Sequence, residues 1–270
     1  MELGVSPLLP ISTYLLSLFI ANLAEKNTST SQLKSILAAI AWHHNINSLQ
    51  DPTKSLYIRR MLIGNPSFQQ ARTELAPINK ELLHVLLDLI PTNITNPHHQ
   101  ILLKAILLLM YHGCMRVGEA VVSASNEHTL TLKDVDILPT QPPNIRFTLN
   151  SYKHSKEAKT FILPASPATN YCPVNALLHY LSVRPPGPGN LFLHSNAKPV
   201  NRVFVANNIK LLVSLTARDP TCYNTHSLRI GRATDLTRQG VPEGIIKEVG
   251  RWNSDAYLKY VRLGTFTLPH

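Results

Sequence analysis

The chain has 270 residues, with 26 Lys and Arg against 16 Asp and Glu, which gives a formal net charge of +10. A chain of this length buries a full hydrophobic core and is typical of a small domain joined to a larger one. The positive excess favours a polyanionic partner, either nucleic acid or an anionic membrane surface. Three scattered cysteines, Cys114, Cys172 and Cys222, contain no C-x-x-C pair. They form no obvious disulfide framework and indicate a reducing compartment.

The first seventy residues carry apolar residues at helical spacing. The predicted helices are Ile11 to Lys26, Ser31 to His44, Leu56 to Ile63 and Asn65 to Ala71. The apolar run Tyr14 to Ala24 lacks the basic segment of a signal peptide, so we interpret it as part of a core helix. The later apolar run Ile101 to Tyr111 is too short to span a bilayer, and we expect no membrane segment.

Arg72 to Ile78 (RTELAPI) is the predicted linker, because Pro77 disfavours helix at the residue before it. Periodicity after the linker predicts helices over Asn79 to Ile90, Pro97 to His112 and Val117 to Ala124. Arg116 precedes the third of these helices, where unpaired backbone N–H groups favour an anion. On spacing alone, Arg116 and Glu119 could equally be a simple i, i+3 ion pair.

The pattern then changes from helix to strand. The predicted strands are Thr129 to Leu138, Asn144 to Ser151 and Lys159 to Pro164, which suggests a three-stranded antiparallel sheet. Tyr152 to Ala158 (YKHSKEA) connects the second and third strands and contains Lys153 and Lys156. Two more helices follow, Pro173 to Val183 and Asn201 to Leu215. The predicted fold is therefore mostly α with a small antiparallel sheet, an α+β protein.

The last fifth of the chain begins with NTHSLRIGRATDLTRQG, a predicted helix that Gly240 and Pro242 end. His226 and Arg229 are three residues apart, so their side chains share a helical face. One face thus carries two groups that bind phosphate.

A second helical piece, Glu243 to Val249, leads through Gly250 to Arg251 and Trp252. Ser254 is the predicted N-cap of a final helix that carries Tyr257 and Tyr260. Because these two tyrosines are three residues apart, helical spacing does not choose between them.

This ordered series resembles the C-terminal motif of the tyrosine recombinase (phage-integrase) family: an H-x-x-R box, a Gly-x-His/Trp turn and a nucleophilic tyrosine eight or nine residues later. VGRWNSDAYLKYVR is most similar to recombinases of eukaryotic mobile elements, in which Trp often replaces the second His. The family also has an Arg in a G-x-x-R-x-x-E setting, as in GCMRVGE here, and a Lys on a β-hairpin. The matching residues are Arg116, Lys153 with Lys156 in reserve, His226, Arg229, Trp252 and Tyr260.

The resemblance implies a helical core-binding (SAM-like) DNA-binding domain over residues 1–72 and a recombinase catalytic domain over 78–270. It implies a site-specific recombinase or integrase that cuts and rejoins DNA through a covalent 3′-phosphotyrosine, with no metal or cofactor. The expected partner is double-stranded DNA, on which the protein would assemble as a dimer or tetramer. The expected location is nuclear if the protein is eukaryotic and otherwise cytoplasmic.

The residue types are chemically adequate for this reaction. Tyrosine is a poor nucleophile while protonated, so Tyr260 needs cationic neighbours. Arg116 and Arg229 would hold the phosphate oxygens, and His226 would donate to the phosphate or accept the tyrosine proton. The family roles add Trp252 as an indole N–H donor and Lys153 as the acid for the leaving 5′ oxygen.

The same sequence features are compatible with two other functions. One is a recombinase fold that binds DNA without cutting it, although such a protein has no chemical reason to keep all the catalytic positions. The other is a type IB topoisomerase, which shares the chemistry but usually carries a larger clamp. We therefore favour the recombinase.

Overall fold

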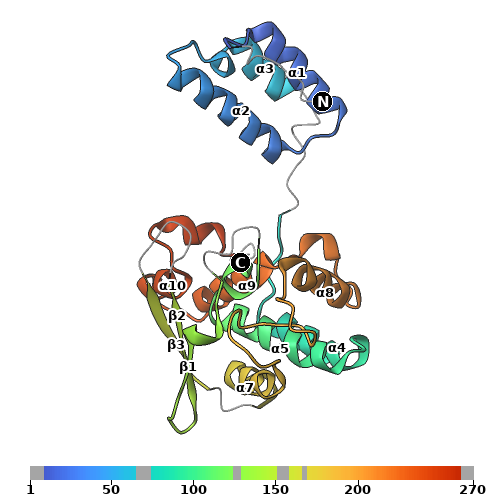
Figure 1. The fold of residues 1–270 in the computed structure, drawn as a ribbon, viewed down its shortest axis with the longest axis vertical. Helices are drawn as coiled ribbons and strands as arrows, with labels where there is room; N and C mark the ends of the chain where they lie inside the picture. The colour runs from blue at the N-terminus through green and yellow to red at the C-terminus, as the bar shows by residue number, and fades with distance from the viewer. Residues whose placement is uncertain (1–8, 65–73, 124–128, 151–157, 166–168, 263–270) are drawn as a thin grey trace, which may run out of the picture. The chain divides into compact units, whose positions relative to one another are not determined.

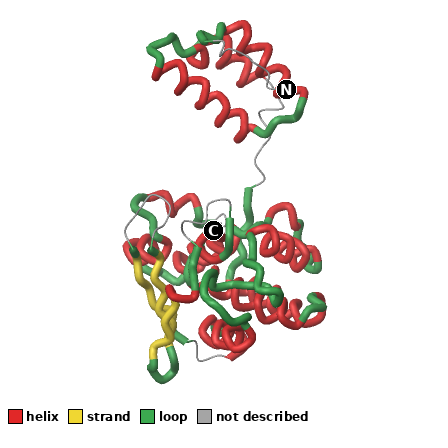
Figure 2. Tube along the Cα trace, viewed as in Figure 1, coloured by secondary structure: helices red, strands yellow, loops and turns green. Residues whose placement is uncertain are grey.

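The computed structural model describes residues 9–64, 74–123, 129–150, 158–165 and 169–262. The chain divides into two compact units, Met1–Arg72 and Thr73–His270. Helices dominate both units, and the second unit also holds the small antiparallel sheet that the sequence predicts (Figure 2). None of the helices within the described ranges is long and apolar enough to cross a membrane.

The first unit packs three helices around a small apolar core. These are α1 (Thr13–Glu25), α2 (Thr30–Ile46) and α3 (Leu56–Gly64), with a short 3₁₀ turn, Pro52–Lys54, before α3 (Figure 1). Ser12 and Ser29 cap α1 and α2 by accepting backbone N–H bonds at 3.2 Å. The first three predicted helices are confirmed, whereas the predicted helix Asn65 to Ala71 lies outside the described residues.

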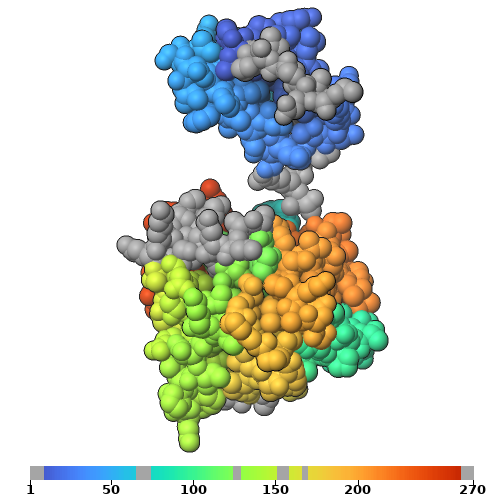
Figure 3. Space-filling view, viewed as in Figure 1, coloured from blue at the N-terminus to red at the C-terminus, as the bar shows by residue number. Residues whose placement is uncertain are grey.

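Helix α5 is the centre of the second unit, since almost every side chain from Leu102 to Tyr111 is buried. It contacts α4, α7 and α9, which surround it in Figure 1. The helices of this unit are α4 (Lys80–Asn93), α5 (Pro97–His112), α6 (Val117–Ala120), α7 (Pro173–Val183), α8 (Arg202–Ser214), α9 (His226–Arg238) and α10 (Glu243–Gly250). Short 3₁₀ turns lie at Leu132–Asp134, Thr169–Tyr171, Pro220–Cys222 and Asp255–Lys259. The sheet and the segments around α8 cover the face shown in Figure 3.

The sheet has the order β1-β2-β3, with both pairs antiparallel. The strands are β1 (Val135–Leu138), β2 (Asn144–Leu149) and β3 (Lys159–Leu163). Val135, Phe147 and Phe161 are in register across it, and the two phenylalanine rings stack with centroids 5.5 Å apart. This row anchors one face of the sheet to the core.

Three predicted elements differ from the structure. The first strand starts at Val135 rather than Thr129, because the Asp134 carboxylate accepts the Thr131 backbone N–H at 2.8 Å and holds a 3₁₀ turn. The third helix, α6, stops at Ala120, because the Val122 backbone N–H donates to the Val200 carbonyl at 2.9 Å. The final predicted helix is a short 3₁₀ turn, Asp255–Lys259, capped by Ser254 as expected. Tyr260 follows that turn directly.

Candidate active site

Helix α9 is held rigidly in the second unit, and this fixes the H-x-x-R box. Its Gly231 lies so close to the loop before α4 that an added Cβ would sit 1.8 Å from the Ile78 carbonyl oxygen. Further along α9, the Asp235 carboxylate accepts the Lys80 backbone N–H at 2.7 Å and the Tyr111 hydroxyl. These contacts from α4 and α5 orient the helix.

His226 is the first residue of α9, and its backbone N–H donates to Asn224 Oδ1 at 2.7 Å. Arg229 follows one turn later and is completely buried. Its two terminal nitrogens donate to the carbonyls of Cys114 and Gly250, one before α6 and the other at the end of α10. Burial lowers the pKa of the Arg229 guanidinium, because desolvation disfavours its charged form. Arg229 therefore joins three segments that are far apart in sequence.

Arg116 is the N-cap of α6, as its position in the sequence predicts. Its backbone N–H and its Nη1 donate to the two oxygens of Glu119 at 2.9 and 3.1 Å. The Arg116 side chain keeps 22% of its surface exposed, while that of Glu119 keeps only 4%. Burial by itself would raise the pKa of Glu119, but the cationic side chains of Arg251, Arg229 and Arg116 hold it below its usual range.

Two aromatic rings lie over Arg229, and the His226 ring lies beside one of them. The Trp252 ring centre lies 4.3 Å and the Tyr260 ring centre 5.5 Å from the guanidinium carbon. The Tyr260 ring is 5.0 Å from that of His226 and 5.1 Å from that of Trp252. The Trp252 indole N–H is buried, and no acceptor for it lies within the described part of the chain. The site thus places the unpaired indole N–H of Trp252 beside the charged guanidinium of Arg229.

Tyr257 has a different environment from Tyr260. Its side chain is buried, with its ring 6.3 Å from that of Trp252 and the Lys247 ammonium 5.5 Å above it. Tyr260 is only half-buried and contacts both His226 and Trp252. Of the two tyrosines, Tyr260 is the one beside the motif residues.

The two candidate lysines, Lys153 and Lys156, lie outside the described residues. The strand that follows them is described, and its first residue reaches the end of α10. Lys159 Nζ donates to the Glu248 carbonyl at 3.3 Å. The start of β3 therefore lies close to the end of α10, the helix that leads to Trp252.

One residue that the sequence interpretation missed is Arg251. Its side chain is 1% exposed and forms an ion pair with Glu119, Nη2 to Oε2, at 2.6 Å. The sequence gives no signal for it, because the left-handed position at a helix end usually holds Gly or Asn and its ion-pair partner lies more than a hundred residues away.

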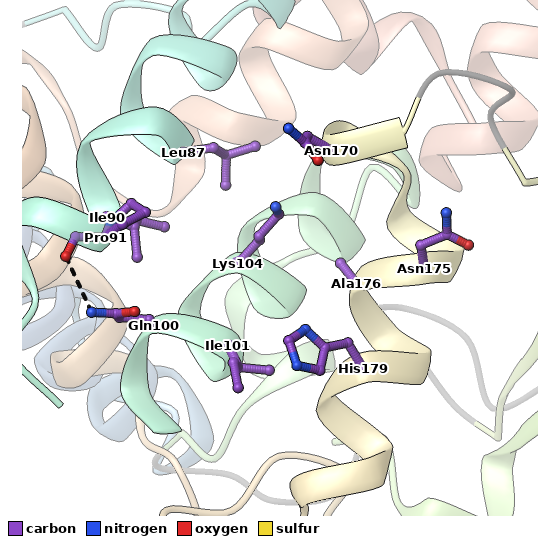
Figure 4. A pocket seen from close by; sticks show the side chains of 10 residues that line it. All are labelled: Leu87, Ile90, Pro91, Gln100, Ile101, Lys104, Asn170, Asn175, Ala176 and His179. Atoms are coloured by element: carbon purple, nitrogen blue, oxygen red, sulfur yellow. Dashed lines mark hydrogen bonds between the residues drawn. The ribbon is translucent and has the colours of Figure 1, made fainter. Parts of the chain in front are cut away.

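A separate pocket of about 410 Å³ lies between α4, α5 and α7. Lys104 and His179 are its titratable side chains, and Gln100 closes one end with a 3.2 Å bond to the Pro91 carbonyl (Figure 4). None of the motif residues lines it. Among the described residues, no group of three or more His, Cys, Asp or Glu side chains could hold a metal ion.

Comparison with known proteins places the chain in a family. The Phage integrase family model matches residues 80–262, about two thirds of the chain. A comparison with curated proteins gives no match. The fold is similar to the XerH site-specific recombinase bound to its palindromic difH substrate (TM-score 0.52, 15% identity), covering 71% of this chain and 49% of that one. The chain therefore spans only about half the length of that recombinase.

Two further structures are similar over most of the chain. One is the Tn1549 transposon integrase in complex with a circular intermediate DNA, with a TM-score of 0.64, 18% identity, and 98% of this chain and 86% of that one covered. Another is a lambda integrase dimer bound to a core site, with a TM-score of 0.57, 9% identity, and coverage of 94% and 65%. With the family match over α4 to α10, these likenesses in fold lead to one conclusion: the chain belongs to the phage integrase family, the tyrosine recombinases.

Proposed function

We propose that this protein is a site-specific DNA recombinase or integrase that cuts one DNA strand through Tyr260 and then rejoins it. The observation that carries the proposal is the cluster in which His226 and Trp252 surround Tyr260 while Arg229 lies within 5.5 Å of its ring. Arg116 belongs to the same group of contacts, because Glu119 accepts bonds from both Arg116 and Arg251. A tyrosine beside cationic side chains suits attack on a phosphodiester.

In the proposed reaction, the Tyr260 hydroxyl oxygen attacks phosphorus and the bond from phosphorus to the 5′ oxygen breaks. His226 accepts the tyrosine proton, and Lys153 gives a proton to the leaving 5′ hydroxyl, with Lys156 as the alternative donor. Arg116 and Arg229 stabilise the charge that gathers on the two non-bridging oxygens. The unpaired indole N–H of Trp252 supplies one more donor. Attack by the 5′ hydroxyl of a second strand reverses these steps.

The burial of Arg229 also suggests an order of events. Arg229 is wholly buried under the rings of Trp252 and Tyr260, although its Nε–H has no acceptor among the described residues. A phosphate can therefore reach Arg229 only after at least one of these rings moves aside, and Tyr260 is the less buried of the two. Because Tyr260 lies beyond a five-residue 3₁₀ turn rather than inside a long helix, this movement disrupts little regular structure.

We further propose double-stranded DNA as the partner, bound by residues 1–72 and 78–270 as the core-binding and catalytic domains. The basic charge supports this, and the XerH and Tn1549 neighbours are complexes with DNA. Assembly as a dimer or tetramer on DNA, and a nuclear location if the chain comes from a eukaryotic mobile element, belong to the same proposal.

A second candidate is a DNA-binding protein that has lost cleavage. The complete burial of Arg229 favours it, since a site that never opens would bind DNA without reacting.

The deciding experiment uses a nicked duplex that traps the covalent intermediate by losing the short 5′ fragment. The wild-type chain is expected to form a protein–DNA adduct that survives denaturing electrophoresis. Tyr260→Phe, which removes only the attacking hydroxyl, should give no adduct and bind DNA normally, while Tyr257→Phe should keep the adduct. DNA binding without any wild-type adduct would establish the second candidate.

A further inference from the structure

Arg251 occupies a backbone conformation that an arginine does not favour. It ends α10 with φ 57° and ψ 46°, in the left-handed region where glycine is the usual residue. Its backbone N–H donates to the Glu248 carbonyl at 3.1 Å, and that of Trp252 donates to the Lys247 carbonyl at 2.9 Å. Any residue could make these backbone bonds. The contacts of the side chain must therefore offset the cost of the left-handed backbone conformation.

The Arg251 side chain forms an ion pair and hydrogen bonds with segments on both sides of the candidate site. Besides its 2.6 Å pair with Glu119, its Nη2 donates to the Cys114 carbonyl at 3.1 Å. Its Nη1 donates to the carbonyls of Gly113 and Val249, both at 3.2 Å. Both members of the ion pair are nearly inaccessible, with side chains 1% and 4% exposed. A pair removed from water in this way keeps its geometry closely, because either charge left alone would be strongly disfavoured.

The segments that Arg251 joins carry the proposed phosphate-binding groups. On one side, the same Glu119 carboxylate holds Arg116 through its backbone N–H and its Nη1. On the other side, Arg251 immediately precedes Trp252. Gly250 gives this turn its tightness, since an added Cβ there would lie 1.6 Å from the Trp252 ring. The position of Trp252 relative to Arg116 thus depends on this buried ion pair, together with the bonds from Arg229 to the Cys114 and Gly250 carbonyls.

We propose that Arg251 is a positioning residue that works with Glu119 to set the distance between Arg116 and Trp252. It touches no substrate itself. Its planar fork holds the Glu119 carboxylate through Nη2 and the Gly113 carbonyl through Nη1, which a lysine ammonium cannot do with the same geometry. The part of this inference that concerns reaction rate rests on the proposed function. The part that concerns the position of Trp252 does not.

The test uses Trp252 as its own reporter. Trp42, the other tryptophan, lies in the first unit and is 59% exposed, so Trp42→Phe leaves Trp252 as the single tryptophan, which can be excited selectively over the tyrosines. In that background we compare Arg251→Met, Arg251→Lys and Arg251→Gly. The glycine variant suits the backbone and lacks only the side chain. Arg146→Met is the matched control, because Arg146 pairs with Asp136 at 3.0 Å but keeps 46% of its side chain exposed.

Arg251→Met and Arg251→Gly should shift the Trp252 emission to the red and slow single-turnover cleavage by about tenfold or more, with DNA affinity changed less than about threefold. Arg251→Lys should recover part of the rate, and Arg146→Met should match the parent in every measurement. If Arg251→Met does not fold, Arg251→Lys decides: a parental rate and emission overturn the proposal. Arg251→Gly with parental emission and rate overturns it as well.

Failure of the proposed function gives a different result. If the parent forms no covalent adduct at all, the rate comparison disappears and the emission comparison remains. A red shift in Arg251→Gly but not in Arg146→Met then supports the positioning role within a site that does not cleave. Equal emission in both variants would remove the positioning role too. A double substitution, Glu119→Gln with Arg251→Met, should shift the emission no more than Arg251→Met alone, since both changes break one pair.

Discussion

The guanidinium carbon of Arg229 lies 4.3 Å from the centre of the Trp252 ring, while its terminal nitrogens hold the carbonyls of Cys114 and Gly250. One side chain from α9 therefore supports the segment before α6 and the turn after α10 together. These bonds from one buried cation hold together three segments that lie far apart in sequence.

Arg116→Ala should reduce cleavage far more than binding. Arg116 is the partly exposed arginine of the cluster, so its loss disturbs packing less than the loss of Arg229. Removing one donor to the transition-state oxygens should lower the cleavage rate by roughly 100- to 1,000-fold. DNA affinity should change little, because this is one phosphate contact among many. Adduct formation and gel-shift titration measure the two effects, and a parallel loss of both would contradict the assignment.

Duplex binding should weaken steeply with salt. The chain carries ten more basic than acidic side chains, and each phosphate that a Lys or Arg neutralises releases a condensed counterion. If about five phosphates are neutralised, the logarithm of affinity should fall with the logarithm of salt concentration with a slope near −4.5. Fluorescence anisotropy from 50 to 200 mM salt gives the slope. A flat profile would remove DNA as the partner.

Gly231→Ala should destabilise the second unit strongly. The added Cβ would lie 1.8 Å from the Ile78 carbonyl oxygen, so α9 would have to move away from the loop before α4. We expect the free energy of unfolding to fall by about 2–4 kcal/mol. Gly244→Ala is the control, since nothing lies within 4 Å of its Cβ and alanine favours helix. Urea unfolding compares the variants, and equal stability of the two would contradict the close packing.

Much of this fold is predictable from the sequence, because its helices begin at residues that can cap them. Pro97–His112 and Pro173–Val183 match their predicted limits, since proline at the first helical position marks each start. The predicted helix Val117 to Ala124 extends too far, because the structure ends α6 at Ala120. Val122 bonds to Val200, a partner that no local pattern reveals.

The candidate site was predictable as a set of residues but not as a geometry. The motif spacing identifies His226, Arg229, Trp252 and Tyr260, and the structure brings these four together. The burial of Arg229 and the pair between Arg251 and Glu119 depend on contacts across more than a hundred residues. Spacing within one helix carries no information about them. Lys153 stays a prediction, since it lies outside the described residues.

The protein should lose stability as pH falls below about 6.5, and His112 should account for part of the loss. Burial, followed by the charges of Arg232, Lys80 and His84, lowers the pKa of His112 to about 3. Between the two values the unfolded chain binds a proton that the folded chain does not. The free energy of unfolding therefore falls with decreasing pH in this window, by at most about 1.4 kcal/mol per pH unit for one group.

His112→Gln removes this titration. Its free energy of unfolding should depend less steeply on pH between about 3 and 6.5 than that of the wild type. Urea unfolding at several pH values gives both slopes. Identical slopes would show that His112 takes up its proton in the folded state as readily as in the unfolded chain.

Trp252→Phe should separate the packing of the Trp252 ring from hydrogen bonding by its indole N–H. Phenylalanine keeps a ring against Arg229 but removes the indole N–H, which is buried without an acceptor among the described residues. If that N–H donates to the reacting phosphate, cleavage should slow by about 10- to 100-fold while DNA affinity stays within about threefold. Trp252→His returns a ring N–H and should recover part of the rate, although it packs less well over Gly250. Single-turnover cleavage of the nicked duplex measures each variant. A Trp252→Phe variant that cleaves at the wild-type rate would show that the indole only packs, and the phosphate would then depend on Arg116, Arg229 and His226 alone.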